Sequence, residues 1–274
     1  ALKQFFKYMY VPVPYSIFEG IYKLEPGCIL TMQKPPRNEP ANLLHPQEGK
    51  DALYEDLHIT KWYKLKETIS KNSKEQINDE TEATERLERQ LKETIKIQSL
   101  ADVPLGAFLS GGVDSSAIVA LMQDQASAPI KTFTIGFEES QFDESPFAKA
   151  VASYLKTDHY EMRVTSKDAL SLIPKLPHLY DEPFADSSQI PTYFVSQAAK
   201  KEVTVSLSGD AGDELFGGYN RYLMAPELWK KINWMPFSTR KLLGSSLHKM
   251  PMGLWDKVGD LYNLVRSDSK GITH

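Results

Sequence analysis

Hydrophobic residues in the first part of this chain come in short runs separated by proline and glycine. Pro26-Gly27 predicts a turn between two short strands at residues 20–24 and 28–32. The polar, proline-rich stretch 33–51 predicts a loop. Residues 1–75 are therefore too short and too interrupted to form a convincing core of their own.

A helical spacing begins near Asn78. Apolar residues recur every four positions among charged ones, which predicts a helix with one apolar face over residues 78–98, and acidic residues in its first turns suit the helix dipole. That apolar face comprises Ala83, Leu87, Leu91 and Ile95.

Beyond this helix, strands and helices alternate. The expected strands are 103–110, 130–137, 159–164 and 202–208, and the expected helices between them are 115–125, 145–155 and 192–201. In helix 145–155 we place Phe147, Val151, Tyr154 and Leu155 on one face. The alternation predicts an α/β fold, with a parallel sheet covered by helices on both faces and preceded by a small β region.

Composition narrows the class of protein. The chain has 274 residues, of which 41% are hydrophobic and 25% charged, as in soluble globular proteins of one or two domains. A formal net charge of −4 gives no basic field for nucleic acid. Cys28 is the single cysteine, which excludes an intramolecular disulfide and fits a reducing compartment. With no apolar run of membrane-spanning length and no signal-peptide layout, we expect a cytoplasmic protein without nucleic-acid or membrane partners.

The stretch Ser110–Ser115 ("SGGVDS") follows an expected strand and opens a helix, where ligands bind parallel sheets. Gly111 and Gly112 allow the backbone to approach an anion, while the two serine hydroxyls and the free N–H groups of the helix donate hydrogen bonds. The stretch is neither a Walker A motif nor a dinucleotide fingerprint. It predicts a phosphate-binding loop.

Asp114 places a carboxylate inside this loop. A carboxylate repels a bare polyphosphate, but the contact becomes favourable when a divalent cation bridges carboxylate and phosphate oxygens. We therefore predict a phosphate group bound with Mg²⁺. The alternative is a helix start at which Asp114 and the serines only cap backbone N–H groups.

A second acidic loop, 207–214 ("LSGDAGDE"), follows the last expected strand and so lies at the same sheet edge. Asp210, Asp213 and Glu214 contribute carboxylates, which together suggest a metal site and an acid–base group. The alternative is a solvated acidic turn that is capped by its own side chains.

Several stretches resemble known families. The loop at 110–115 is similar to the pyrophosphate-binding loop of the N-type ATP pyrophosphatases, whose fold is adenine nucleotide alpha hydrolase-like. Residues 180–193 ("YDEPFADSSQIPTY") and 207–222 ("LSGDAGDELFGGYNRY") resemble signatures of glutamine-dependent asparagine synthetases. Residues 10–30 are similar to the segment that joins the glutaminase and synthetase domains of those enzymes. The resemblance extends from about residue 8 to at least residue 230.

The resemblance implies roles for individual residues. The residues implied to hold pyrophosphate are Ser110, Gly111, Gly112, Asp114 and Ser115. Those implied to contact the adenosine part of ATP are Leu109, Ile135, Ser208 and Gly209. Those implied to bind Mg²⁺ are Asp114 and Asp213.

Three further implications concern catalysis and the acceptor. Asp210 occupies the place of an acidic catalytic residue that takes a proton from attacking ammonia. Ala211 stands where glycine is expected, and it restricts the loop if its φ is positive. Glu182, Asp186 and Ser187 are candidates for binding an amino acid, against the alternative of capping the following helix.

The resemblance also implies a reaction and a domain plan. ATP converts the side-chain carboxylate of aspartate to a β-aspartyl adenylate, ammonia from a glutaminase domain attacks it, and AMP and pyrophosphate are released. Residues 1–75 are expected to be the remnant of a glutaminase domain plus a linker, and 76–274 an ATP-pyrophosphatase domain truncated at its C-terminal side. Because residue 1 is alanine rather than the nucleophilic cysteine, we expect no glutamine hydrolysis by this chain. A homodimer is left open.

Three other functions remain compatible with these motifs. Relatives of this kind amidate other carboxylates, such as cell-surface sugar acids, or close lactams. The tRNA-modifying pyrophosphatases share the first loop, but the net charge of −4 counts against an RNA substrate. The third alternative is a nucleotide-binding module without turnover.

Overall fold

The computed structural model describes residues 1–34, 52–54, 57–139, 141, 143–248, 251 and 253–255, so most of the loop expected at 33–51 lies outside the described residues. The chain divides into a first unit, Ala1–Asp210, and a second unit that begins at Ala211. This division does not test the domain boundary expected near residue 75, which stays a prediction.

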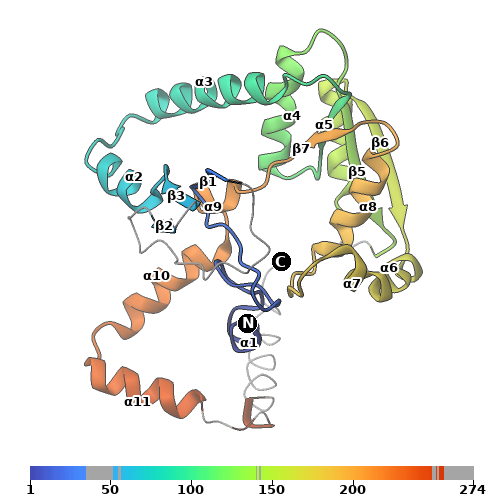
Figure 1. Ribbon diagram of the computed structural model, residues 1–274. Helices are drawn as coiled ribbons and strands as arrows, with labels where there is room; N and C mark the ends of the chain where they lie inside the picture. The colour runs from blue at the N-terminus through green and yellow to red at the C-terminus, as the bar shows by residue number, and fades with distance from the viewer. Residues whose placement is uncertain are drawn as a thin grey trace, which may run out of the picture. The chain divides into compact units, whose positions relative to one another are not determined.

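The first unit contains a four-stranded parallel sheet (Figure 1). Its strands are β4 (Leu105–Phe108), β5 (Lys131–Phe137), β6 (Asp158–Val164) and β7 (Val205–Leu207), in the spatial order β6-β5-β4-β7. Ala107 pairs with Thr132 on one side and with Leu207 on the other. The four expected strands are confirmed, although β7 is shorter than the stretch 202–208.

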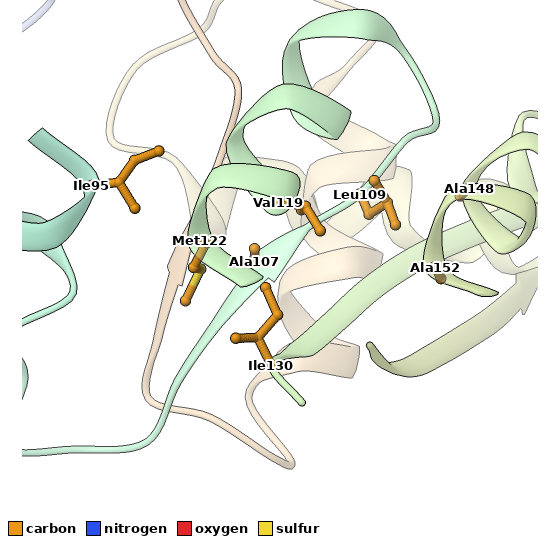
Figure 2. Packing of buried hydrophobic residues seen from close by; sticks show 8 residues of the cluster. All are labelled: Ile95, Ala107, Leu109, Val119, Met122, Ile130, Ala148 and Ala152. Carbon is orange, nitrogen blue, oxygen red and sulfur yellow. The ribbon is translucent and has the colours of Figure 1, made fainter. Parts of the chain in front are cut away.

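Helices pack on both faces of this sheet, as expected. The bounds of those around the sheet are α3 (Glu80–Gln98), α4 (Val113–Gln125), α5 (Ser145–Leu155), α6 (Ser166–Leu172), η1 (Ile173–Lys175), α7 (Leu176–Leu179) and α8 (Gln189–Ala199). Ala107 and Phe108 are successive residues of β4, so their side chains point to opposite faces. Ala107 packs with α3, α4 and α5 (Figure 2), whereas Phe108 joins Phe133 and Ala199 of α8. The expected fold class is confirmed.

The apolar face assigned to α5 is partly wrong. Phe147 is 67% exposed and Tyr154 85% exposed, while the buried residues of the helix include Ala148 and Ala152. The reason is close packing, because a Cβ added at Gly111 would lie 2.5 Å from the Ala148 backbone nitrogen. Large side chains do not fit in so narrow a space, so alanines face the core.

The helix expected at 78–98 is confirmed as α3. Asp79 caps it by accepting a 2.8 Å hydrogen bond from the backbone N–H of Glu82. The expected apolar face is buried mainly at its C-terminal end, where Ile95 is 3% exposed, whereas Leu87 is 40% exposed.

The N-terminal region contains α1 (Leu2–Tyr8), a three-stranded antiparallel sheet and α2 (Leu65–Asn72). The sheet has the order β1-β3-β2, with β1 (Cys28–Met32), β2 (Ala52–Tyr54) and β3 (Leu57–Lys61). The turn at Pro26-Gly27 is confirmed, because the N–H of Cys28 donates to Glu25. The strand expected at 20–24 is wrong, since only Tyr22 makes an isolated bridge there and β1 pairs with β3 instead.

The second unit contains α9 (Gly212–Phe216), α10 (Asn220–Ile232) and α11 (Phe237–His248). Within the described ranges, no helix is both long enough and apolar enough to cross a membrane.

His159 of β6 makes the stability of the first unit sensitive to pH. Its Nδ1 lies 2.9 Å from Thr132 Oγ1, and its buried Nε2 has no hydrogen-bond partner among the described residues. Burial lowers the pKa of His159 below its ordinary value of 6.5, while nearby Glu161 raises the pKa and Lys149 lowers it.

A lowered histidine pKa means that the unfolded chain binds the proton more readily than the folded chain. We therefore expect the contribution of His159 to the free energy of unfolding to be independent of pH above 6.5 and to become destabilising as the pH drops through 6.5. Urea unfolding from about pH 7.5 to about pH 5.5 measures this. The variant His159→Asn should show a flatter profile, and an equally steep one would assign the effect to other groups.

Candidate functional site

The site lies at the carboxyl edge of the parallel sheet, where the strand order reverses. The chain runs from β4 outward through β5 and β6 and then crosses to β7 on the other side of β4. The loops that follow β4 and β7 therefore separate at a topological switch point, the usual place for a ligand in such sheets. The expected phosphate loop, Ser110–Ser115, follows β4, and Ser208–Asp210 follows β7.

Hydrogen bonds between its own serines hold the phosphate loop in shape. Ser110 Oγ lies 2.9 Å from Ser115 Oγ and accepts a 3.2 Å hydrogen bond from the N–H of Gly112. Ser115 Oγ accepts from the N–H of Ser110 and donates to the carbonyl of Gly112. The loop is thus preformed, and α4 begins directly behind it with a glycine at its N-cap.

Two glycines allow the backbone to pack closely around this loop. Gly111 has φ 85°, and Gly209 approaches the first turn of α4 so closely that an added Cβ would lie 2.7 Å from the Ser115 backbone nitrogen. The loops after β4 and β7, distant in sequence, are therefore in backbone contact. The structure brings together Gly209 with Asp114 and Ser115, as the sequence predicts for one shared site.

The Asp114 carboxylate accepts no hydrogen bond from any of the residues that the structure describes, and Gly112 rather than Asp114 occupies the N-cap of α4. The capping alternative therefore accounts for the serines but not for Asp114. The described ranges contain no group of three or more His, Cys, Asp or Glu side chains placed to hold a metal ion. A cation at Asp114 would need further oxygen ligands, which phosphate groups can supply.

The acidic residues after β7 have different surroundings. Asp210 is exposed at the end of the first unit and accepts a 3.0 Å hydrogen bond from Ser208 Oγ. In the second unit, Glu214 accepts a 2.7 Å hydrogen bond from Tyr219, which raises the pKa of Tyr219 to about 12 and lowers that of Glu214. Asp213 packs so tightly on Gly218 that any side chain at position 218 would overlap its carboxylate. Glu214 therefore has a structural partner, whereas Asp210 is accessible.

Ala211 has φ 71°. The condition under which we expected it to restrict the loop, a positive φ, is therefore met. A left-handed conformation costs an L-residue about 1–2 kcal/mol, and glycine would relieve this strain. Part of the gain is lost, because glycine has more conformational freedom in the unfolded chain. We expect Ala211→Gly to raise the free energy of unfolding by about 0.5–1 kcal/mol, measured by denaturant titration. A loss of stability would show that Ala211 is not strained.

A cavity of about 300 Å³ lies beside the phosphate loop. Three residues expected at the nucleotide, Leu109, Ser110 and Ile135, line it. The size is that of a small ligand pocket, and the walls are mainly apolar with a few polar groups, as such pockets require. Ser208 and Gly209 do not line this cavity but lie at the loop after β7.

Comparison with known proteins identifies the family. A family model described as asparagine synthase matches residues 86–271, which is more than half of the chain. The chain belongs to the asparagine synthase family. It is 38% identical over 224 residues to the putative asparagine synthetase [glutamine-hydrolyzing] 2 of Methanocaldococcus jannaschii, and 32% identical over 257 residues to asparagine synthetase [glutamine-hydrolyzing] 1 of Bacillus subtilis strain 168. These matches cover 81% and 94% of the chain, but only 39% and 36% of the relatives.

Nine other described residues that line the cavity beside the phosphate loop were not connected with the nucleotide from the sequence. They are Phe108, Phe133, Thr134, Phe137, Glu144, Ser188, Pro191, Thr192 and Val195. The last four belong to or adjoin α8, and the signature at 180–193 contains three of them. That signature was a usable signal, but only the packing of α8 on the sheet shows that it forms a cavity wall.

The acidic residues of the same signature make local contacts. Asp186 accepts hydrogen bonds from the N–H and the hydroxyl of Ser188, at 2.8 Å and 2.6 Å, which lower the pKa of Asp186. Glu182 forms a 2.8 Å ion pair with Lys23. Asp186 thus holds the turn before α8, and Glu182 pairs with Lys23 rather than capping that helix. Amino-acid binding by Glu182, Asp186 and Ser187 stays a prediction.

Proposed function

We propose that this chain is the synthetase part of a cytoplasmic glutamine-dependent asparagine synthetase. It would use ATP to amidate aspartate through a β-aspartyl adenylate, releasing AMP and pyrophosphate. One observation carries the proposal: in a chain of the asparagine synthase family, a preformed phosphate loop adjoins a cavity at the sheet's switch point, and the Asp114 carboxylate in that loop accepts no hydrogen bond from the described residues. The whole reaction is a proposal because the chain spans less than two fifths of these relatives.

In the first step, Leu109 and Ile135 hold the adenosine part of ATP, and Ser110–Ser115 hold the departing pyrophosphate. Loop N–H groups and serine hydroxyls donate to phosphate oxygens that gain charge as the α–β bond breaks. Asp114 fits Mg²⁺, because its carboxylate oxygens accept no hydrogen bond from the part of the chain that the structure describes. Bound there, the metal would neutralise the charge on pyrophosphate. Metal binding by Asp213 stays a prediction from the sequence resemblance.

In the second step, ammonia attacks the activated carbonyl carbon and AMP leaves. The nitrogen must lose a proton as the amide forms, and Asp210 is the group that we assign to accept it. The hydrogen bond from Ser208 Oγ orients the Asp210 carboxylate, and its exposure lets the proton pass on to water.

The first 75 residues are proposed to be the remnant of a glutaminase domain plus a linker, so ammonia would come from a glutaminase domain. Large apolar side chains exposed in this region support a contact with another folded body. They include Leu2 at 70%, Phe6 at 73%, Met9 at 57%, Ile21 at 57% and Ile29 at 52%.

Exchange of labelled pyrophosphate into ATP tests this function. The chain is incubated with ATP, Mg²⁺ and one carboxylic acid at a time: aspartate, glutamate or a sugar acid. Exchange that depends on aspartate supports the proposal, whereas exchange that depends on another acid identifies a different acceptor. Nucleotide binding without exchange for any acid would contradict catalysis by this chain.

A further inference from the structure

A second cavity, of about 840 Å³, lies within the first unit where two distant parts of the chain meet. One side is formed by Met9–Lys23, called here the N-terminal segment, and the other by Tyr180–Phe184. The two sides are joined by a 2.8 Å hydrogen bond from the N–H of Ala185 to the carbonyl of Met9. Val11, at 2% exposure, anchors the N-terminal segment in this contact.

Lys23 makes a charged contact across this junction. Its ammonium donates to the carbonyl of Val11 at 2.6 Å and to Glu182 Oε2 at 2.8 Å. The Glu182 side chain is only 18% exposed and the Lys23 side chain 35% exposed. Hydrogen bonds between charged groups with this little solvent access are stronger than those of an exposed pair, so the contact restrains Glu182.

The stretch that contains Glu182 leads directly into the wall of the cavity of about 300 Å³ beside the phosphate loop, called here the nucleotide cavity. Tyr180 donates a 3.2 Å hydrogen bond to the carbonyl of Gln189, the first residue of α8, and Asp186 holds the backbone of Ser188. Ser188, Pro191 and Thr192 then line the 300 Å³ cavity. The restrained stretch and the cavity wall are thus one continuous, hydrogen-bonded piece of chain.

We propose that Lys23 is a positioning residue for the nucleotide cavity, and that it acts through Glu182 on the start of α8. Lys23 does not line that cavity, so its effect is indirect. The proposal rests on the proposed function, in which the cavity takes the nucleoside part of ATP. It predicts that the N-terminal segment and the nucleotide cavity are coupled through Tyr180–Ser188.

Calorimetric titrations of the full chain with AMP and with pyrophosphate test this role separately. In Lys23→Met, we expect affinity for AMP to fall about tenfold, because a displaced α8 fits the nucleoside less well. Affinity for pyrophosphate should stay unchanged, because Ser110–Ser115 hold it independently of α8. Lys23→Arg keeps the charge and should recover most of the AMP affinity. Glu182→Gln, which keeps the size of the side chain, should repeat the loss.

Lys131→Met is the matched control. Lys131 forms a 2.6 Å ion pair with Glu202, with side-chain exposures of 33% and 34%, but it begins β5, at the end of the strand opposite the site. It should leave AMP affinity at the wild-type level, with thermal unfolding recorded for each variant. An equal loss of AMP affinity in this control, or AMP affinity in Lys23→Met within twofold of wild type, would overturn the positioning role alone. If wild type bound neither AMP nor pyrophosphate, the proposed function would fail as well.

Discussion

Replacing Asp114 with asparagine should reduce Mg²⁺-dependent pyrophosphate exchange by at least about 100-fold. Asparagine keeps the size of the side chain but removes the charge that makes a cation favourable beside phosphate oxygens. Because the Asp114 carboxylate has no hydrogen-bond donor among the described residues, the change should leave the fold intact. The loss should appear as a much higher Mg²⁺ requirement or as no exchange at any Mg²⁺ concentration.

Asp124→Asn provides the control, since Asp124 lies on the same helix, α4, and pairs with Lys92 at 3.1 Å away from the loop. Its exchange rate should match that of wild type. Exchange by Asp114→Asn within a few-fold of wild type, with an unchanged Mg²⁺ dependence, would mean that Asp114 binds no catalytic metal.

Gly209→Ala should damage both stability and nucleotide binding. The new Cβ would lie 2.7 Å from the Ser115 nitrogen and 2.9 Å from the Asp114 carbonyl carbon, and both are backbone atoms that cannot move aside cheaply. Forced overpacking of this kind costs about 1–3 kcal/mol. Relief of the clash must separate the two loops, so we expect ATP affinity to fall by at least about tenfold, measured calorimetrically beside denaturant unfolding.

The control is Gly244→Ala in α11, where an added Cβ meets nothing within 4 Å. Alanine in a helix interior is favoured over glycine by up to about 1 kcal/mol, so this variant should be as stable as wild type or more stable. If Gly209→Ala behaved in the same way as Gly244→Ala, the close approach of the two loops would be refuted.

The fold of the first unit could be predicted because its signals are local. Alternation of apolar strands with helical segments is a property of neighbouring residues, and it gave β4–β7 and the helices between them. The partner of β1 is different, because β3 lies about thirty residues further along the chain and only tertiary packing selects it. The exposed side of α5 was missed for a related reason, since the close approach of α5 to Gly111 is a tertiary contact that the helical spacing of residues 145–155 does not encode.

The candidate site shows the same division. The phosphate loop is contiguous, so the sequence alone indicated Ser110–Ser115 and the unusual Asp114. The cavity is assembled from the ends of β4 and β5 and from α8, and no spacing in the sequence reveals that Thr192 and Glu144 share it with Ile135. The sequence could not predict that φ of Ala211 is positive; it predicted only what would follow if it were. The identity of a residue limits its backbone conformation without fixing it.

A crystal structure of the chain with Mg²⁺ and a non-hydrolysable ATP analogue tests the central claim most directly. We expect Mg²⁺ at about 2.1 Å from an Asp114 oxygen and from phosphate oxygens held by the loop. The adenosine should occupy the cavity beside Ile135. An empty loop at saturating nucleotide, with Asp114 bonded only to backbone amides, would contradict the account.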